Sequence, residues 1–177
     1  IALTRHEVLH IYQYYKKHKN KAKHYTHNAA AVAVLSVDDE YESEKFQQYM
    51  RMLYTHLTKE ETEANLAEFT AGIKTWKIEN RMKLKKEIES TPKDEYLNKI
   101  SDEISEDEKK AILRTFLDTY LETSKDYGLK PKKFIINLAN KGFDHFMSST
   151  YDIIRNGMVS WSKKINKINY KNLNDKK

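Results

Sequence analysis

Two histidines near the start of the chain have types and spacing that could do chemistry. His6 and His10 flank Glu7 in the sequence H-E-V-L-H, which matches the H-E-x-x-H pattern of zinc peptidases. Histidines four residues apart share a helix face and can bind Zn²⁺, with the glutamate as general base. The simpler interpretation is a surface pair, because Glu7 is placed to close a capping box with Thr4. No Gly-rich turn leads to a third ligand, so we expect neither a metal nor a catalytic site.

The distribution of lysines predicts a binding surface instead. Residues 1–37 hold six Lys or Arg against one Glu, and residues 158–177 hold six Lys against one Asp. Lysines neutralise phosphates, and interleaved tyrosines offer flat surfaces for unpaired bases. We therefore predict an interface for RNA, or for single-stranded nucleic acid generally. The predicted residues are Lys16, Lys17, Lys19, Lys21, Lys23, Tyr14, Tyr25, Lys163, Lys164 and Lys167.

Other interpretations of this charge pattern are open. An AT-rich genome also gives abundant Lys, Asn, Ile and Tyr, and these lysines would then be merely solvated. Trp161 would point inward as part of the core, together with the tyrosines that lie at helical spacing. A basic face would equally dock an acidic peptide or a cytoskeletal partner. We predict nucleic-acid binding first and a protein-interaction module as the alternative.

Composition narrows the class of protein further. The chain has 177 residues, a net charge of +6 and no Cys, which excludes disulfides, thiol nucleophiles and cysteine-ligated zinc. No run approaches the ~20 apolar residues that a membrane span needs. There is no Gly-rich phosphate loop and no nucleophile elbow. We expect a non-enzymatic protein without a cofactor, in the cytoplasm and also the nucleus. The sequence leaves open whether a signal or export segment precedes Ile1.

The elements that position these residues are all predicted to be helices. Four Gly and two Pro leave little material for hairpins. Thr4 with Glu7, and Ser105 with Glu108, form equivalent helix starts 101 positions apart, each preceded by an apolar residue. We predict one all-α domain over residues 1–177. It is a helical bundle of two pseudo-twofold related halves, residues 3–57 and 104–158, joined by connecting helices over 58–103 that include a long central helix.

Turn residues predict the boundaries of the remaining helices. A Tyr-containing break at Tyr25 precedes a short helix over residues 28–37, and the next helix begins near Asp38. Thr91 and Pro92 read as an N-cap and a first helical position. In the second half, residues 105–124 form a helix that Gly128 ends, and Pro131 starts a short helix closed by Gly142. Gly157 is predicted to stop the helix over residues 143–156, before a last basic helix over 158–170.

A chain without cysteine, rich in tyrosine and lysine and built from two related helical halves, resembles the 25–27 kDa gametocyte antigen of Plasmodium. The paired starts at residues 3–7 and 104–108 carry this resemblance. It implies a homodimeric, RNA-binding phosphoprotein of early sexual development. Candidate positions for the phosphorylation are the clustered hydroxyls of Ser148, Ser149 and Thr150. That family is also associated with proline-rich ligands for SH3 domains. This role is in doubt for the present chain, because Pro92 and Pro131 form no P-x-x-P motif. Leu57 to Glu61 and Trp76 also resemble the opening of exported Plasmodium helical domains.

Overall fold

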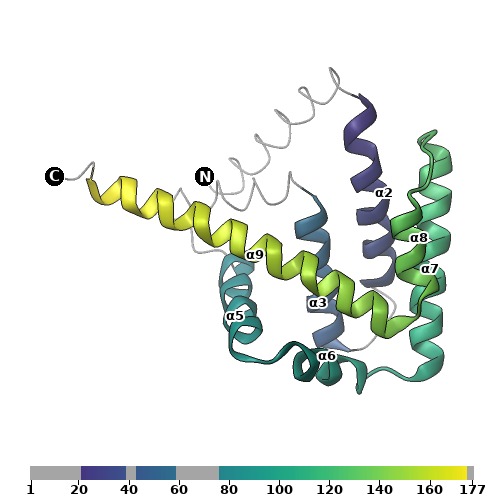
Figure 1. Ribbon diagram of the computed structural model, residues 1–177, viewed down its shortest axis with the longest axis horizontal. Helices are drawn as coiled ribbons and strands as arrows, with labels where there is room; N and C mark the ends of the chain where they lie inside the picture. The colour runs from purple at the N-terminus through teal and green to yellow at the C-terminus, as the bar shows by residue number, and fades with distance from the viewer. Residues whose placement is uncertain (1–20, 39–42, 59–75, 175–177) are drawn as a thin grey trace.

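The protein is all-α over the residues that its computed structural model describes, which are 21–38, 43–58 and 76–174. Seven helices follow one another in this part of the chain (Figure 1). They are α2 (Lys21–Asp38), α3 (Glu44–Leu57), α5 (Trp76–Ser90), α6 (Lys93–Ser101), α7 (Glu106–Asp126), α8 (Lys133–Asn140) and α9 (Phe143–Asn174). The predicted fold class is therefore confirmed at the level of all-α, and the pseudo-twofold relation between the halves stays a prediction.

The core lies where α2, α3, α7 and α9 meet. α9 crosses the other helices, while α7 and α8 stand together at one side of the molecule (Figure 1). Phe116 of α7 meets Phe146 of α9 edge to face, with ring centroids 5.0 Å apart, a favoured geometry for aromatic pairs. Tyr49 of α3 is fully buried, and its hydroxyl donates to the Met147 carbonyl at 2.9 Å. The same hydroxyl lies 2.6 Å from Thr150 Oγ1, so polar contacts also tie α3 to α9.

Helix starts and stops that rest on local hydrogen bonds were predicted correctly in the second half. Ser105 caps α7 through a capping box, in which its hydroxyl accepts from the Glu108 amide and its own amide donates to the Glu108 carboxylate. Gly128 and Gly142 have φ of 64° and 97°, and each follows the end of a helix as predicted. The equivalent start at Thr4 and Glu7 lies outside the described residues.

Three predicted boundaries in the first half and the linker were wrong. Within the described residues, the helix of Lys21–Asp38 runs through Tyr25 without a break, because residues 21–28 contain neither Gly nor Pro. Asp38 ends α2, whereas α3 starts at Glu44 with Ser43 as its N-cap. The N-cap of α6 is Pro92 and not Thr91 as predicted. No side chain forms a capping hydrogen bond at the start of this helix. Of the predicted long central helix, the described part is α5.

The predicted stop at Gly157 was also wrong, because α9 is continuous from Phe143 to Asn174. Gly157 lacks the positive φ that marks Gly128 and Gly142. Its side of α9 faces the His56 ring of α3, and a Cβ on Gly157 would lie 2.5 Å from Cγ of that ring. The glycine therefore serves the close approach of two helices instead of ending one.

Candidate nucleic-acid interface

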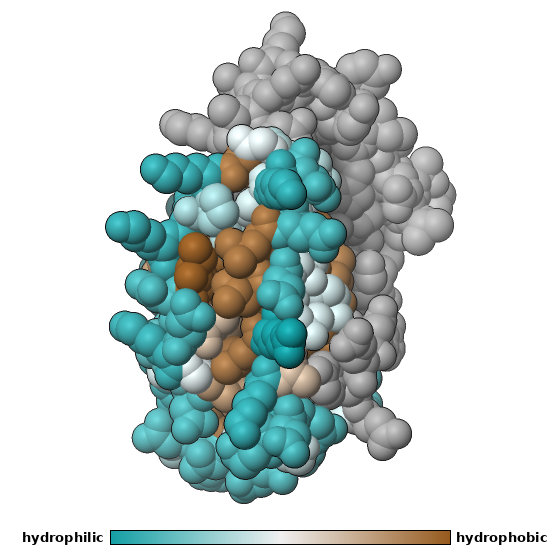
Figure 2. All heavy atoms as spheres, turned by 90° about the vertical axis from the view of Figure 1, so that its right-hand side faces the viewer, coloured by the Kyte–Doolittle hydropathy of each residue, from teal (hydrophilic) through white to brown (hydrophobic). Residues whose placement is uncertain are grey.

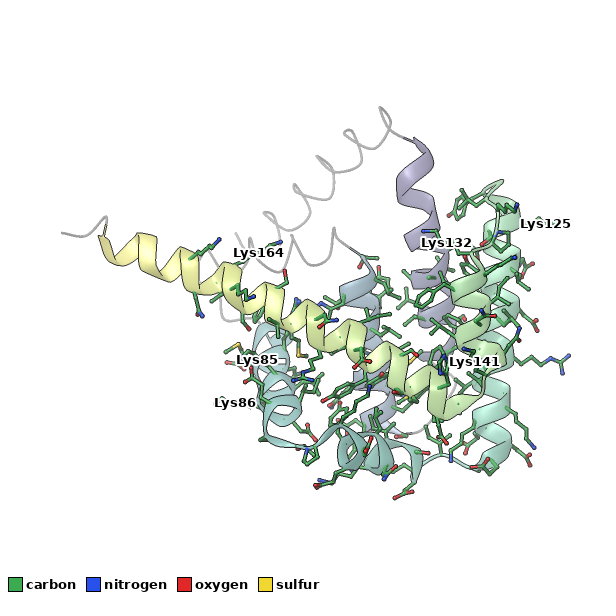
Figure 3. All side chains as sticks on the ribbon, viewed as in Figure 1. Lys85, Lys86, Lys125, Lys132, Lys141 and Lys164 are labelled. Carbon is green, nitrogen blue, oxygen red and sulfur yellow. The ribbon has the colours of Figure 1, made fainter. Side chains whose placement is uncertain are left out.

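The three predicted lysines of α9 lie exposed along the outer part of that helix. Lys163, Lys164 and Lys167 have no carboxylate within ion-pair distance among the described residues. Lys164 projects from the side of α9 that faces away from α5 (Figure 3). Lys163 and Lys167 are four residues apart and so share a face of the helix, whereas Lys164 is turned by about 100° from Lys163.

Six lysines on α3, α5, α6 and the start of α7 differ from those of α9, because each forms an ion pair with an acidic residue. The pairs are Lys45–Glu103, Lys85–Glu89, Lys93–Asp152, Lys99–Glu95, Lys109–Glu106 and Lys110–Asp107. Exposed pairs of this kind add little to stability, but they neutralise the local field that would attract an anion. The unpaired lysines of α9 therefore remain available to phosphates.

Trp161 is not a stacking platform beside these lysines, because it is 1% exposed and packs in the interior. The guanidinium carbon of Arg81 lies 4.3 Å from the centroid of its ring, a cation–π contact. Arg81 is itself only 3% exposed, and burial lowers the pKa of its guanidinium to about 10. The interpretation of Trp161 as core is confirmed, and Arg81 is no part of a basic surface.

His56 completes this buried cluster. Its Nε2 lies 3.5 Å from Nη2 of Arg81, at the limit of a hydrogen bond. Burial, and secondarily the positive charge of Arg81, lower the pKa of His56 to about 3. The imidazole is therefore neutral at physiological pH, and its Nε2 can accept a hydrogen bond from the Arg81 guanidinium. This cluster joins α3, α5 and α9, and its role is to hold the helix that carries the exposed lysines.

The remaining predicted contacts lie outside the part of the chain that the structure describes. This holds for Lys16, Lys17, Lys19 and Tyr14, and for the histidine pair His6 and His10. Lys21, Lys23 and Tyr25 belong to α2, although only their backbone is described. The part of these residues in nucleic-acid binding stays a prediction.

A basic and aromatic surface that sequence reasoning missed surrounds the turn between α7 and α8. Phe134, in the first turn of α8, is 60% exposed, and Tyr127 at the end of α7 is 51% exposed. Four lysines near them are exposed and have no acidic partner among the described residues: Lys125, Lys130, Lys132 and Lys133. Lys125 and Lys132 both lie at this end of the molecule (Figure 3). The sequence K-P-K-K-F carries the signal, because it places three lysines just before an aromatic residue.

A groove of about 480 Å³ runs between the α5–α6 connection and α9. Ile88, Pro92, Tyr151 and Met158 provide apolar walls, while Lys85, Lys93 and Arg155 bring positive charge to it. Lys93 is paired with Asp152 and also lies over the Tyr151 ring, 5.4 Å from its centroid. Charge and apolar surface are thus combined in one concave site.

Within the described residues, no group of three His, Cys, Asp or Glu side chains is arranged to hold a metal ion. No helix in those same residues is long and apolar enough to span a bilayer. Comparison of the chain with models of protein families, with curated proteins and with solved structures yields no match. The candidate interface must therefore be judged on its own side chains.

Proposed function

We propose that this protein is a non-enzymatic binder of RNA, or of single-stranded nucleic acid generally. The observation that carries the proposal is the set of exposed lysines on α9, Lys163, Lys164 and Lys167, which have no acidic partner among the described residues, whereas six lysines elsewhere are ion-paired. Each lysine that contacts a phosphate releases condensed counterions, which favours binding without a requirement for sequence.

The placement of acidic residues supports the same proposal. The acidic residues between Asp94 and Glu108 lie on α6, on the turn after it and on the first turn of α7. α7 has 21 residues, so about 30 Å separates this acidic corner from the lysines at its far end. The lysines around the turn between α7 and α8 are therefore far from this acidic corner.

A matched pair of triple variants tests the proposal. Replacing Lys163, Lys164 and Lys167 with Gln removes three unpaired charges, whereas replacing Lys45, Lys99 and Lys110 removes three that are ion-paired and also exposed (side chains 53%, 51% and 78%). We expect the first variant to weaken binding of a generic single-stranded RNA in fluorescence anisotropy, and the second to leave it nearly unchanged. Equal losses would show that only net charge matters and would remove the assigned surface.

A protein-interaction module is the second candidate, favoured by the groove between the α5–α6 connection and α9. An acidic peptide with one apolar side chain would match Arg155 and the apolar wall, which includes Met158. Lys85 and Lys93 add less attraction for it, because each is ion-paired with an acidic residue. This function predicts capture of such a peptide in the presence of excess RNA. Loss of peptide binding on addition of RNA would instead assign both ligands to one basic surface.

The resemblance to the gametocyte antigen extends the proposal to a homodimer that acts in the cytoplasm, and in the nucleus, of a parasite in sexual development. Phosphorylation at hydroxyls such as Ser148 would regulate it. Sedimentation equilibrium of the full chain decides the oligomeric state, and a monomer at all concentrations would remove the dimer.

A further inference from the structure

The turn between α7 and α8 presents an aromatic ring to solvent among unpaired lysines. We propose that this turn is a stacking site for an unpaired base of single-stranded nucleic acid, with Phe134 as the platform. The inference rests on the proposed function and deepens it, because it names the part of the strand that is recognised. The turn lies on α7 and α8, apart from the lysines of α9 (Figure 3).

Phe134 is free for this role because the core of α8 does not need it. α8 buries Ile135, Leu138 and Ala139, which follow the i, i+3, i+4 pattern of one helix face. Phe134 lies outside this face and is 60% exposed, the most exposed large hydrophobic side chain among the described residues. A single exposed hydrophobic side chain is common on protein surfaces, so the inference rests on the ring together with the lysines around it.

The turn that holds the ring is fixed by hydrogen bonds. Gly128 adopts a φ of 64°, and its amide donates to the Lys125 carbonyl at 2.9 Å. The Leu129 amide donates to the Ser124 carbonyl at 2.8 Å, the bond that closes a Schellman-type end of α7. The amide of Lys132 donates to the buried Tyr120 hydroxyl at 2.9 Å, which ties the start of α8 to α7. The backbone that carries the ring is thus held by hydrogen bonds before binding, so less backbone entropy is lost when a base stacks on the ring.

Lysines both precede and follow Phe134 in the sequence. Lys130, Lys132 and Lys133 precede Phe134 and are exposed, and the exposed Lys141 is the C-cap that follows the end of α8. Asn137 is also exposed, and it shares a helix face with Phe134 because it lies three residues further along α8. Phosphates before and after the stacked base would meet lysines, and the amide can hydrogen-bond a base edge.

The chemistry of this surface favours an unpaired base over other occupants. A base has a π face that stacks on an aromatic ring, whereas the bases of a duplex are already stacked on one another and unavailable. Figure 2 looks onto the face formed by α7 and α8, where an apolar strip is bordered by hydrophilic side chains. Leu113, Leu117 and Leu121, spaced by four along α7, are all incompletely buried. These leucines add apolar surface to this face of the molecule.

The decisive variants are Phe134→Ala and Phe134→Trp in the full chain. Stacking on one aromatic ring changes the affinity for a single strand by about tenfold or more. We expect Phe134→Ala to weaken binding of a single-stranded RNA by that factor, and Phe134→Trp to restore it. The matched control is Leu35→Ala on α2, which trims another exposed apolar side chain (40% exposed) and should change nothing. Binding of a duplex RNA of the same length should be insensitive to Phe134→Ala.

The outcomes separate this inference from the function on which it rests. If Phe134→Ala leaves single-strand binding unchanged while the Lys163, Lys164 and Lys167 variant reduces it, the stacking site is wrong and the proposed function stands. If Lys130, Lys132 and Lys133 changed to Gln weaken binding but Phe134→Ala does not, the turn supplies charge only, which also overturns the inference. Loss of an acidic protein partner on Phe134→Ala, with RNA binding intact, would make the turn a protein-docking surface. Absence of binding by the unaltered protein overturns both.

Discussion

The imidazole of His56 packs directly against Gly157, and only hydrogen at that position leaves room for the ring. A Cβ on Gly157 would lie 2.5 Å from Cγ and 2.9 Å from Cε1 of the histidine. The glycine sits in the middle of α9, the helix of 32 residues that carries Lys163, Lys164 and Lys167. The contact therefore sets how α3 and α9 cross, and with it the position of the basic surface relative to the core.

Gly157→Ala should destabilise the protein, against the usual effect of this change in a helix. Alanine in an open helix position is favoured over glycine by about 1 kcal/mol. Here the added methyl overlaps the His56 ring, and overpacking of this kind costs about 1–3 kcal/mol. Urea unfolding at pH 7 measures the change.

The control for this prediction is the same substitution in a His56→Ala background. With the ring removed, Gly157→Ala should become neutral or stabilising, because helix propensity then acts alone. An equal loss of stability in both backgrounds would show that the ring and the glycine do not compete for space.

The buried, neutral state of His56 predicts a pH dependence of stability. Its pKa is lowered to about 3 in the folded protein and is about 6.5 when the chain is unfolded, so the unfolded state binds more protons between these values. Stability is therefore greatest above pH 6.5 and falls with pH below it, by on the order of 1 kcal/mol per pH unit. His56→Gln keeps a polar side chain without this titration. Unfolding at pH 7 and pH 5 should show a smaller drop in the variant, and equal drops would contradict the buried-histidine account.

The hydroxyl of Tyr49 should contribute measurably to the joint between α3 and α9. Tyr49→Phe removes its bond to the Met147 carbonyl, while Thr150 keeps its own bond to the Phe146 carbonyl at 2.7 Å. The expected loss is about 1–2 kcal/mol, because a buried carbonyl loses one donor and ring packing is retained. Thermal or urea unfolding of Tyr49→Phe checks this, with Thr150→Val and the double variant to resolve the coupling. No change in stability would mean that water replaces the hydroxyl.

The sequence predicted helices best where one local signal determined the structure. Ser105 and Glu108 close a capping box within four residues, and Gly128 and Gly142 end helices through their own φ. Neither requires knowledge of what packs nearby. The predicted helix stop at Gly157 was wrong because the glycine is explained by its contact with the His56 ring. His56 lies 101 residues earlier in the chain, and no local sequence pattern indicates such a contact.

The candidate site was predicted only in part for a related reason. Exposed lysines on α9 follow from helical spacing, since Trp161 and Ile165 face the core and leave Lys163 and Lys164 outside. Phe134 was not among the predicted residues, because an aromatic residue beside Ile135 and Leu138 suggests burial. The sequence does show that Phe134 lies next to the i, i+3, i+4 face of α8 and not on it. Which face of α8 is buried, however, depends on its packing against α7.

Zinc content gives a separate check on His6 and His10. We expect protein purified without an affinity tag to contain no stoichiometric zinc, because the H-E-V-L-H pattern is interpreted as a capped helix start with surface histidines. Elemental analysis measures this directly. One zinc per chain, lost in a His6→Ala variant, would revive the peptidase alternative.

The salt dependence of single-stranded RNA binding by the unaltered protein tests the central claim most directly. Each phosphate contact on a single strand contributes about 0.7 to the slope of log affinity against log salt. Three lysines on α9 that contact phosphates therefore predict affinity that falls with salt with a slope of about −2 or steeper. Absence of binding at low salt, or an affinity that salt does not change, would contradict the account.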